Sequence, residues 1–166
     1  MKIVLIGFMA TGKSNVAPIL AGMLNLNIVE MDDLIVGKSG GKSIAEIFET
    51  GGEAAFRKLE VDVSRDLQHA DNVVISTGGG VVMNETVIGY LADNAEVVEL
   101  YASFETLLQR IGRDIPRPLF EDEQAARQLY ELRKPLYNKY AAIHVSTDGK
   151  SIDGVAEEIA GKVQRI

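Results

Sequence analysis

The sequence predicts an α/β domain in which helices cover both faces of a parallel sheet. Short apolar runs rich in β-branched residues alternate with stretches whose apolar residues recur at helical spacing. The first run, Lys2–Ile6, leads directly into Gly7–Ser14, and helical spacing begins at Lys13. A strand, a glycine-containing loop and a helix in this order are typical of phosphate-binding α/β proteins. We therefore expect one three-layer αβα domain spanning residues 1–166.

Further elements follow the same alternation. Four more runs are expected to be strands: Asn27–Met31, Asn72–Thr77, Ala95–Tyr101 and Ala141–Ser146. Helices are expected from Lys13 onward and over 43–50, 53–69, 84–93, 103–112, 122–140 and 151–165. Ser43 and Glu46 have the spacing of a capping box. Gly51–Gly52 should break one helical stretch, Pro135 should break another, and 37–42 should be a loop.

Composition narrows the class of protein. The formal net charge of −7 argues against general nucleic-acid binding, which leaves a basic footprint. The chain has no cysteine, which excludes disulfides and thiolate metal sites and is compatible with a reducing compartment. It also has no apolar run of the ~20 residues that a membrane span needs. We expect a monomeric cytoplasmic protein that binds small molecules, with no nucleic-acid or membrane partner.

The Gly7–Ser14 stretch fits the phosphate-binding P-loop pattern, G-x-x-x-x-G-K-[ST]. Its glycines would let backbone N–H groups surround phosphate oxygens, and the following helix would direct its positive end toward them. Lys13 would add a positive charge at the β- and γ-phosphates, and the Ser14 hydroxyl would ligate Mg²⁺. The alternative is a chance match in a turn, which the flanking strand and helix disfavour.

Three other features are candidates for the chemistry. Asp32 follows the second predicted strand, at the sheet edge where α/β proteins bind ligands, or it caps the following helix. Gly78–Gly80 is either a plain turn or a place where the backbone approaches a ligand closely. The aperiodic, arginine-rich segment 110–123 is either a solvated loop or a mobile lid that carries arginines onto a phosphate. Together, the P-loop motif and the arginine-rich segment 110–123 favour an enzyme that transfers a phosphoryl group to a small molecule.

Taken together, five features resemble the shikimate kinase family along the whole chain. They are the P-loop, Glu30-Met31-Asp32, Phe56-Arg57, Gly78-Gly79-Gly80, and Arg117-Pro118-Leu119 followed by Arg133-Lys134-Pro135-Leu136-Tyr137. Only the P-loop motif is specific by itself. All five features in this order and at these separations are hard to obtain from another family. The resemblance implies a five-stranded parallel sheet of order 2-3-1-4-5, a substrate-binding region at about 32–60 and a lid at about 110–123. It also implies that the γ-phosphoryl group of ATP passes to the 3-hydroxyl of shikimate, with Mg²⁺, in aromatic amino acid biosynthesis.

The resemblance also assigns roles to residues. The catalytic residues would be Lys13, Asp32 and Arg117, the last as the lid arginine on the β- and γ-phosphates. ATP would be bound by Gly7, Ala10, Thr11, Gly12, Lys13, Ser14, Asn15, Arg110, Arg117 and Lys150. Shikimate would be bound by Asp32, Arg57, Gly78, Gly79, Gly80 and Arg133. Mg²⁺ would be held by Ser14 and Glu30.

The residue types suit these roles. A guanidinium matches a carboxylate bidentately, so Arg57 and Arg133 fit an acidic substrate, and an ionised Asp32 accepts hydrogen bonds from hydroxyls. Phosphoryl transfer depends on positioning and charge neutralisation, so we expect Asp32 to be mainly an orienting group, with deprotonation of the attacking hydroxyl as the second hypothesis. Alternatively, Arg57 and Arg133 are partners in surface ion pairs. The sequence departs from the family's usual pattern at Glu30, one methylene longer than aspartate, and at Ala10, where glycine is common.

Rival functions remain open on sequence alone. Gluconate kinase and the nucleoside monophosphate kinases share the expected architecture, and gluconate, another carboxylate polyol, would bind similar groups. A monophosphate kinase would need more arginines directed at a second phosphate. A non-catalytic nucleotide-binding regulator is the alternative from a different class, and the intact Lys13, Asp32 and Arg133 argue against it.

Overall fold

The structure is a computed structural model that describes the backbone of residues 1–114 and 122–165 and the side chains of 1–111 and 122–165. Its centre is a five-stranded parallel sheet with the strand order β2-β3-β1-β4-β5. The strands are β1 (Lys2–Ile6), β2 (Asn27–Glu30), β3 (Val73–Ser76), β4 (Glu96–Tyr101) and β5 (Ile143–Ser146). The parallel sheet and its order confirm the fold predicted from the sequence.

Helices connect successive strands. They are α1 (Lys13–Leu24), α2 (Met31–Lys38), α3 (Ile44–Asp66), α4 (Glu85–Ala92), α5 (Phe104–Asp114), α6 (Glu123–Tyr140) and α7 (Ile152–Val163), with a 3₁₀ turn, η1 (Val81–Met83), before α4. Side-chain caps begin several of them, and the capping box predicted at Ser43 is one of these. Ser43 forms the capping box with Glu46, while Asn84 and Ser151 accept hydrogen bonds from backbone N–H groups of α4 and α7.

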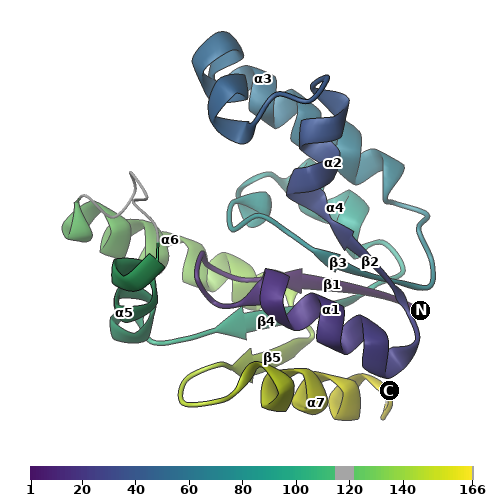
Figure 1. The fold of residues 1–166 in the computed structure, drawn as a ribbon. Coiled ribbons are helices and arrows are strands. Elements are labelled where there is room, and N and C mark those ends of the chain that lie inside the picture. Colours follow the sequence, from purple (N-terminus) through teal and green to yellow (C-terminus); the bar gives the residue numbers. More distant parts are fainter. Residues whose placement is uncertain (115–121, 166) are drawn as a thin grey trace.

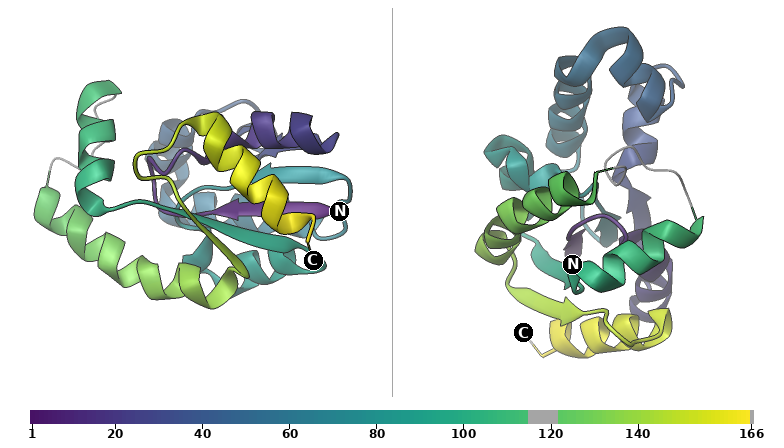
Figure 2. Two further views of the ribbon diagram at one scale, coloured as in Figure 1. Left: turned by 90° about the horizontal axis from the view of Figure 1, so that it is seen from below. Right: turned by 90° about the vertical axis from the view of Figure 1, so that its left-hand side faces the viewer.

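Two apolar clusters hold the layers together, one on each face of the sheet. Helices α1 and α7 pack on one face, where Ile3, Leu5 and Val98 point. The opposite face, where Val4 and Ile6 point, is covered by α3, α4 and α6. Figure 2 shows α1 and α7 on one side of the strands and α6 on the other. In the described part of the chain, no helix has the length and apolar character that a bilayer crossing requires.

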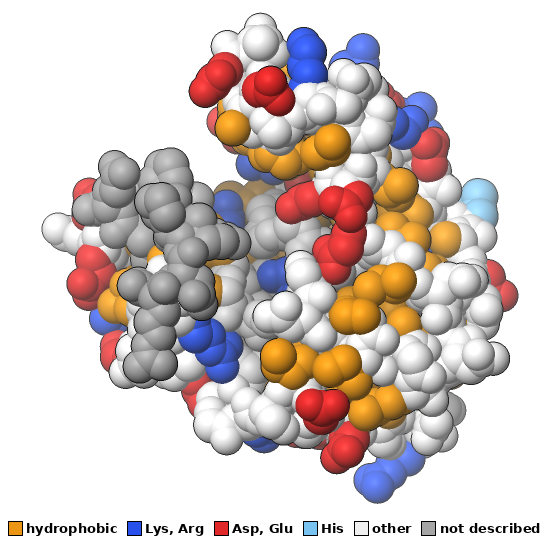
Figure 3. Space-filling view, in the orientation of Figure 1, with side chains coloured by type: hydrophobic (Ala, Val, Ile, Leu, Met, Phe, Trp, Pro, Cys, Tyr) orange, Lys and Arg blue, Asp and Glu red, His pale blue; other side chains and the backbone are white. Residues whose placement is uncertain are grey.

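Helices α2 and α3 form a lobe that projects from the β2 edge of the sheet (Figure 1). Below this lobe the surface is hollowed, with basic side chains in its depth and acidic side chains on its wall (Figure 3). The carboxyl ends of β1, β2 and β3 lead into the P-loop, α2 and the Gly78–Gly80 segment, respectively. Because parallel strands end at the same edge, these three connections are brought together.

Three local predictions need correction. Residues 31–38 form a helix, which the sequence analysis did not predict, with Met31 and Ile35 buried on one side of it. The predicted break near Pro135 is wrong, since α6 continues through it; Pro135 only removes one N–H from the helix. The break at Gly51–Gly52 is a kink within α3, where Gly52 has φ 69° and ψ −175°.

Candidate active site

The P-loop is held in shape by two backbone positions that require glycine. Gly7 has φ 143°, and a Cβ there would lie 2.1 Å from the carbonyl oxygen of Leu100. Gly12, which caps α1, has φ 94°. The buried Lys13 ammonium donates hydrogen bonds to the carbonyl oxygens of Gly7 (2.7 Å) and Phe8 (3.0 Å). The lysine thus lies inside the loop, at the N-terminus of the helix where an anion is favoured.

Ala10 adopts a left-handed conformation with φ 62°, which explains why glycine suits this position. Its carbonyl oxygen accepts a hydrogen bond of 3.1 Å from Arg110 Nη1 on α5. Arg110 also donates to the hydroxyl and the carbonyl oxygen of Thr147, both at 2.9 Å. The arginine therefore links the P-loop to the turn before α7.

A cavity of about 560 Å³ opens beside this arginine. Its walls include six of the residues predicted to bind ATP, namely Ala10, Thr11, Gly12, Asn15, Arg110 and Lys150. Lys150 also forms an ion pair with Glu158, so its ammonium is only partly available to a nucleotide. Thr147, which the sequence analysis did not name as a site residue, lines the cavity as well. Six of the ten residues predicted to bind ATP thus lie around one cavity; Gly7, Lys13 and Ser14 are not among its lining residues, and Arg117 lies outside the described residues.

The predicted metal residues Ser14 and Glu30 lie next to each other, 3.3 Å apart between Oγ and Oε2. Ser76, at the end of β3, is a third oxygen donor, with its hydroxyl 3.4 Å from that of Ser14. The other carboxylate oxygen of Glu30 is buried and has no hydrogen-bond partner among the described residues. Burial raises the pKa of Glu30 above its ordinary value, and the charges of Asp32 and Asp33 add to the rise.

This oxygen set has the character of a hard-cation site. Among residues 1–114 and 122–165 there is no group of three or more His, Cys, Asp or Glu residues that could enclose a metal ion. Mg²⁺ commonly takes only one or two protein ligands beside water and phosphate oxygens. One carboxylate with an unpaired oxygen and two hydroxyls therefore suit Mg²⁺ bound together with a nucleotide.

Asp32 lies in the first turn of α2 and faces the triple-glycine segment. Its Oδ1 would be 3.4 Å from a Cβ placed on Gly78. The N-cap of α2 is Glu30, so Asp32 does not cap this helix. A Cβ on Gly79 would lie 3.2 Å from the backbone nitrogen of Met9 in the P-loop. Close approach of the backbone, rather than a plain turn, thus accounts for Gly79.

Arg57 of α3 and Arg133 of α6 meet at Gly80. A Cβ on Gly80 would lie 3.4 Å from Arg57 Nη1 and 3.6 Å from Arg133 Nη2. Arg133 is buried, with 9% of its surface exposed, and forms no ion pair with any described residue. It donates one hydrogen bond of 3.3 Å to the carbonyl oxygen of Gly79, and its buried Nε has no partner among the described residues. A buried guanidinium without a carboxylate creates a strong preference for an anionic ligand.

Two glutamates hold Arg57. Glu60, almost fully buried, accepts a hydrogen bond of 2.8 Å from Arg57 Nη1. Burial raises the pKa of Glu60, while the hydrogen bond and charge of Arg57 oppose the rise. Exposed Glu53 accepts from Nε and Nη2 of the same guanidinium, both at 3.3 Å. The ion-pair interpretation of Arg57 therefore holds, and it coexists with the position of Arg57 beside Gly80.

Aromatic side chains support the arginines. The Tyr137 hydroxyl donates a hydrogen bond of 2.6 Å to the carbonyl oxygen of Gly79, a role that the sequence analysis did not predict. Phe8 lies beneath Arg133, with its ring centroid 5.7 Å from the guanidinium carbon. Phe56 is partly buried against the core, stacks on Phe48 at 4.8 Å between ring centroids, and has its own ring centroid 5.3 Å from the guanidinium carbon of Arg57.

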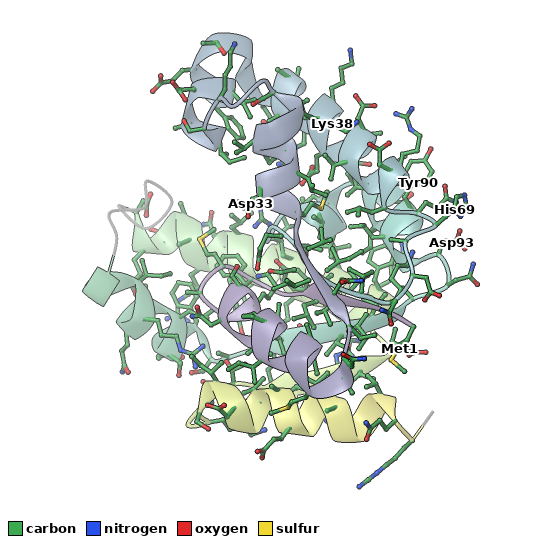
Figure 4. The ribbon with its side chains drawn as sticks, turned by 45° about the vertical axis from the view of Figure 1, so that its right-hand side comes forward. Met1, Asp33, Lys38, His69, Tyr90 and Asp93 are labelled. Carbon is green, nitrogen blue, oxygen red and sulfur yellow. The ribbon has the colours of Figure 1, made fainter. Side chains whose placement is uncertain are left out.

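Arg117, the expected lid arginine, lies outside the described residues, as do all residues from 115 to 121 of the predicted lid. His69, for which no catalytic role is expected, lies with Tyr90 and Asp93 on the side of the molecule away from Asp33 and the site (Figure 4).

A P-loop beside a cavity of nucleotide size, with two arginines brought together at Gly80, has the character of a P-loop kinase that acts on a small acidic acceptor. The comparisons with known proteins are more specific. A sequence model of the family described as shikimate kinase matches residues 9–164. The chain is 43% identical to shikimate kinase of Lactococcus lactis subsp. lactis over 164 residues, covering 98% of each chain. It therefore belongs to the shikimate kinase family and is an ATP-dependent phosphotransferase.

Solved structures agree with this assignment. Shikimate kinase from Acinetobacter baumannii in complex with shikimate superposes with a TM-score of 0.90 at 34% identity, covering 99% of this chain and 93% of that one. A gluconokinase from Sinorhizobium meliloti superposes with a TM-score of 0.66 at 16% identity, covering 99% of this chain and 91% of that one. The second likeness shows only a shared fold.

Proposed function

We propose that this chain transfers the γ-phosphoryl group of ATP to the 3-hydroxyl of shikimate, giving shikimate 3-phosphate and ADP. The observation that carries the proposal is Arg133, a buried guanidinium that has no carboxylate partner among the described residues and meets Arg57 at Gly80. Shikimate offers a planar carboxylate to this pair and hydroxyls to Asp32. The reaction belongs to the shikimate pathway of aromatic amino acid biosynthesis.

Each of these residues would act mainly by positioning a substrate or neutralising its charge. Arg57 and Arg133 would fix the carboxylate end of the acceptor, while Asp32 would orient the attacking hydroxyl by accepting its hydrogen bond. Lys13 and the P-loop N–H groups would neutralise charge on the transferred phosphoryl group. We also propose that Arg117 completes this neutralisation, a role that rests on the family resemblance alone.

We further propose that Mg²⁺ binds with ATP at Ser14 and Glu30. The unpaired buried oxygen of Glu30 and the hydroxyls of Ser14 and Ser76 support this choice. When bound, the ion would neutralise charge on the β- and γ-phosphates. Because the Glu30 carboxylate extends one methylene further than aspartate, it can meet the ion directly or through a water molecule.

We propose a monomer that works in the cytoplasm. The acidic charge, the lack of cysteine and a site assembled from elements of one chain support this view. Light scattering with size-exclusion chromatography at micromolar protein measures the oligomeric state, and a dimer mass would contradict it.

The test of the function is ADP release from Mg·ATP in a coupled assay with no acceptor, with shikimate, with gluconate and with AMP or CMP. We expect release that depends on shikimate alone. ADP release with gluconate instead would support the assignment as a small-molecule kinase and contradict shikimate as the acceptor. ATP binding without turnover on any acceptor would favour a nucleotide-binding regulator.

A further inference from the structure

A second cavity, of about 530 Å³, lies behind the P-loop between β4, β5 and α6. The proposed reaction does not use it. Glu99 of β4 and His144 of β5 line its sheet side, and Tyr130, Glu131 and Lys134 line its α6 side. The volume falls within the usual range of about 300–1,000 Å³ for small-molecule sites.

Glu99 is the unusual group in this cavity. Its side chain is only 9% exposed, and one carboxylate oxygen accepts or shares a hydrogen bond of 2.7 Å with His144 Nδ1. Among the described residues, His144 is the one hydrogen-bond partner of this carboxylate, and Glu99 lines the cavity. A largely buried carboxylate is costly unless its charge is balanced, and a ligand cation would balance it with a charge-assisted hydrogen bond.

The surrounding surface favours an aromatic ligand. The rings of Tyr130 and Tyr137 line the cavity, and Tyr101 at the end of β4 is 42% exposed in its wall. Pro135 has no N–H to donate to the carbonyl oxygen of Glu131 one turn earlier, and both residues line the cavity. Aromatic faces and free acceptor oxygens are the groups that recognise an ammonium ion attached to a ring.

The charge of the cavity is mixed, with carboxylates at Glu99 and Glu131 and cations at Lys134 and, when protonated, His144. These charged groups differ in how deeply they are buried. Lys134 is exposed and lies 5.9 Å from the Tyr130 ring, whereas Glu99 lies in the buried floor. The deepest charge is therefore negative. We propose that this cavity binds a small molecule carrying an ammonium group on an aromatic framework, and that its occupancy alters substrate binding.

The second part of the proposal rests on residues shared with the active site. Thr11 lines both this cavity and the nucleotide-side cavity. Tyr137 lines this cavity with its ring and donates its hydroxyl hydrogen bond to Gly79 on the acceptor side. A ligand that moves either side chain changes the geometry offered to ATP or to the acceptor, and such coupling is reciprocal.

Binding is tested directly on the full chain, without reference to turnover. The probe is phenethylamine, titrated into ¹⁵N-labelled protein and followed by amide chemical shifts, with 3-phenylpropionate as the anionic ring control. We expect saturable shifts on β4 and α6 for the amine and binding weaker by about tenfold or more for the acid. Absence of saturable shifts at these elements would overturn the proposal.

Variants locate the site. Glu99→Gln keeps the size and the hydrogen bond to His144 but removes the charge, so amine binding should weaken by about tenfold or more. Glu96→Gln, on the same strand outside the cavity, is the matched control and should bind as the unmodified chain does. If Glu99→Gln lowers the melting temperature, Asn138→Phe fills the cavity from the exposed face of α6 and should also abolish binding. Unchanged affinity in a folded Glu99→Gln or Asn138→Phe chain contradicts the assignment.

Coupling is then measured by substrate titrations with and without saturating phenethylamine. We expect the KM of ATP or of shikimate to change by about fivefold, with no such change in Glu99→Gln. If the amine binds and both KM values stay constant, the influence on substrate binding is overturned.

Discussion

Arg57 and Arg133, on helices α3 and α6, bring their guanidinium groups to the same backbone position, Gly80. Their electrostatic surroundings differ. Arg57 has two glutamates beside it, whereas Arg133 is buried without an ion pair to any described residue. The charge that an acceptor carboxylate would neutralise is therefore mainly that of Arg133, and Arg57 adds directional hydrogen bonds. This difference leads to separate predictions for the two arginines.

Replacing Arg133 with methionine should impair the enzyme without weakening its fold. Arg133→Met keeps much of the volume but removes an unpaired buried charge, so the free energy of unfolding should stay constant or rise. The KM of shikimate should increase by an amount equivalent to about 2–5 kcal/mol, while the KM of ATP changes little. Steady-state kinetics and urea unfolding measure the two effects. Arg127→Met, at an exposed position of α6, is the control, and an equal KM increase there would contradict the assignment.

A methyl group at Gly80 should interfere with the acceptor but not with folding. Gly80 has φ −94°, which alanine adopts without strain, and its Cβ would meet only the ends of the two arginines. Gly80→Ala should therefore retain its melting temperature and raise the KM of shikimate. Gly7→Ala is the contrasting variant, because its Cβ would collide with the Leu100 carbonyl oxygen at 2.1 Å. Gly7→Ala should lower the melting temperature. An equal decrease in Gly80→Ala would contradict the expectation that the fold tolerates a methyl group at Gly80.

Glu53 should compete with the acceptor for Arg57. Its carboxylate accepts hydrogen bonds from Nε and Nη2, an edge of the guanidinium that a substrate carboxylate can also use. Glu53→Gln weakens this pairing, so the KM of shikimate should fall by roughly twofold to fivefold, as expected for an exposed ion pair worth up to about 1 kcal/mol. The KM of ATP should not change. The exposed Glu49→Gln serves as the control, and a higher KM for shikimate in Glu53→Gln would mean that Glu53 positions Arg57 instead.

Glu60 should make stability depend on pH. Burial raises its pKa, so the folded chain binds a proton here more tightly than the unfolded chain does. The resulting stabilisation is present below the unfolded pKa and is lost as the pH rises through the folded value. Glu60→Gln cannot lose that proton. Urea unfolding at about pH 4 and about pH 8 should therefore show the unmodified chain losing stability relative to Glu60→Gln as the pH rises. A constant difference between the two chains would exclude this contribution.

The fold was largely predictable because its signals are local. The five apolar runs and the Ser43 capping box each lie within a few consecutive residues. Helix α2 was not predicted, since Met31 and Ile35 are its only buried residues and Gly37 weakens the pattern. Pro135 was expected to end a helix, but tertiary contacts on both sides of it maintain α6.

Prediction of the site was uneven for the same reason. Residues in motifs, such as Lys13 and Gly79, could be named from the sequence because their neighbours along the chain define them. Ser76 and the hydroxyl of Tyr137 could not, because their partners Ser14 and Gly79 become neighbours only when the sheet forms. The catalytic and binding roles assigned to all these residues stay predictions until the variants are measured.

The hydrogen bonds of Arg110 bear on how a nucleotide would enter. This side chain joins the Ala10 carbonyl oxygen in the P-loop to Thr147 in the turn before α7, and all three residues line one cavity. The two loops are thus tied to each other by hydrogen bonds of the protein itself. Binding to such a preorganised cavity loses less conformational entropy than binding that must first order its loops. We therefore expect ATP to associate in a single kinetic phase whose rate rises linearly with nucleotide concentration.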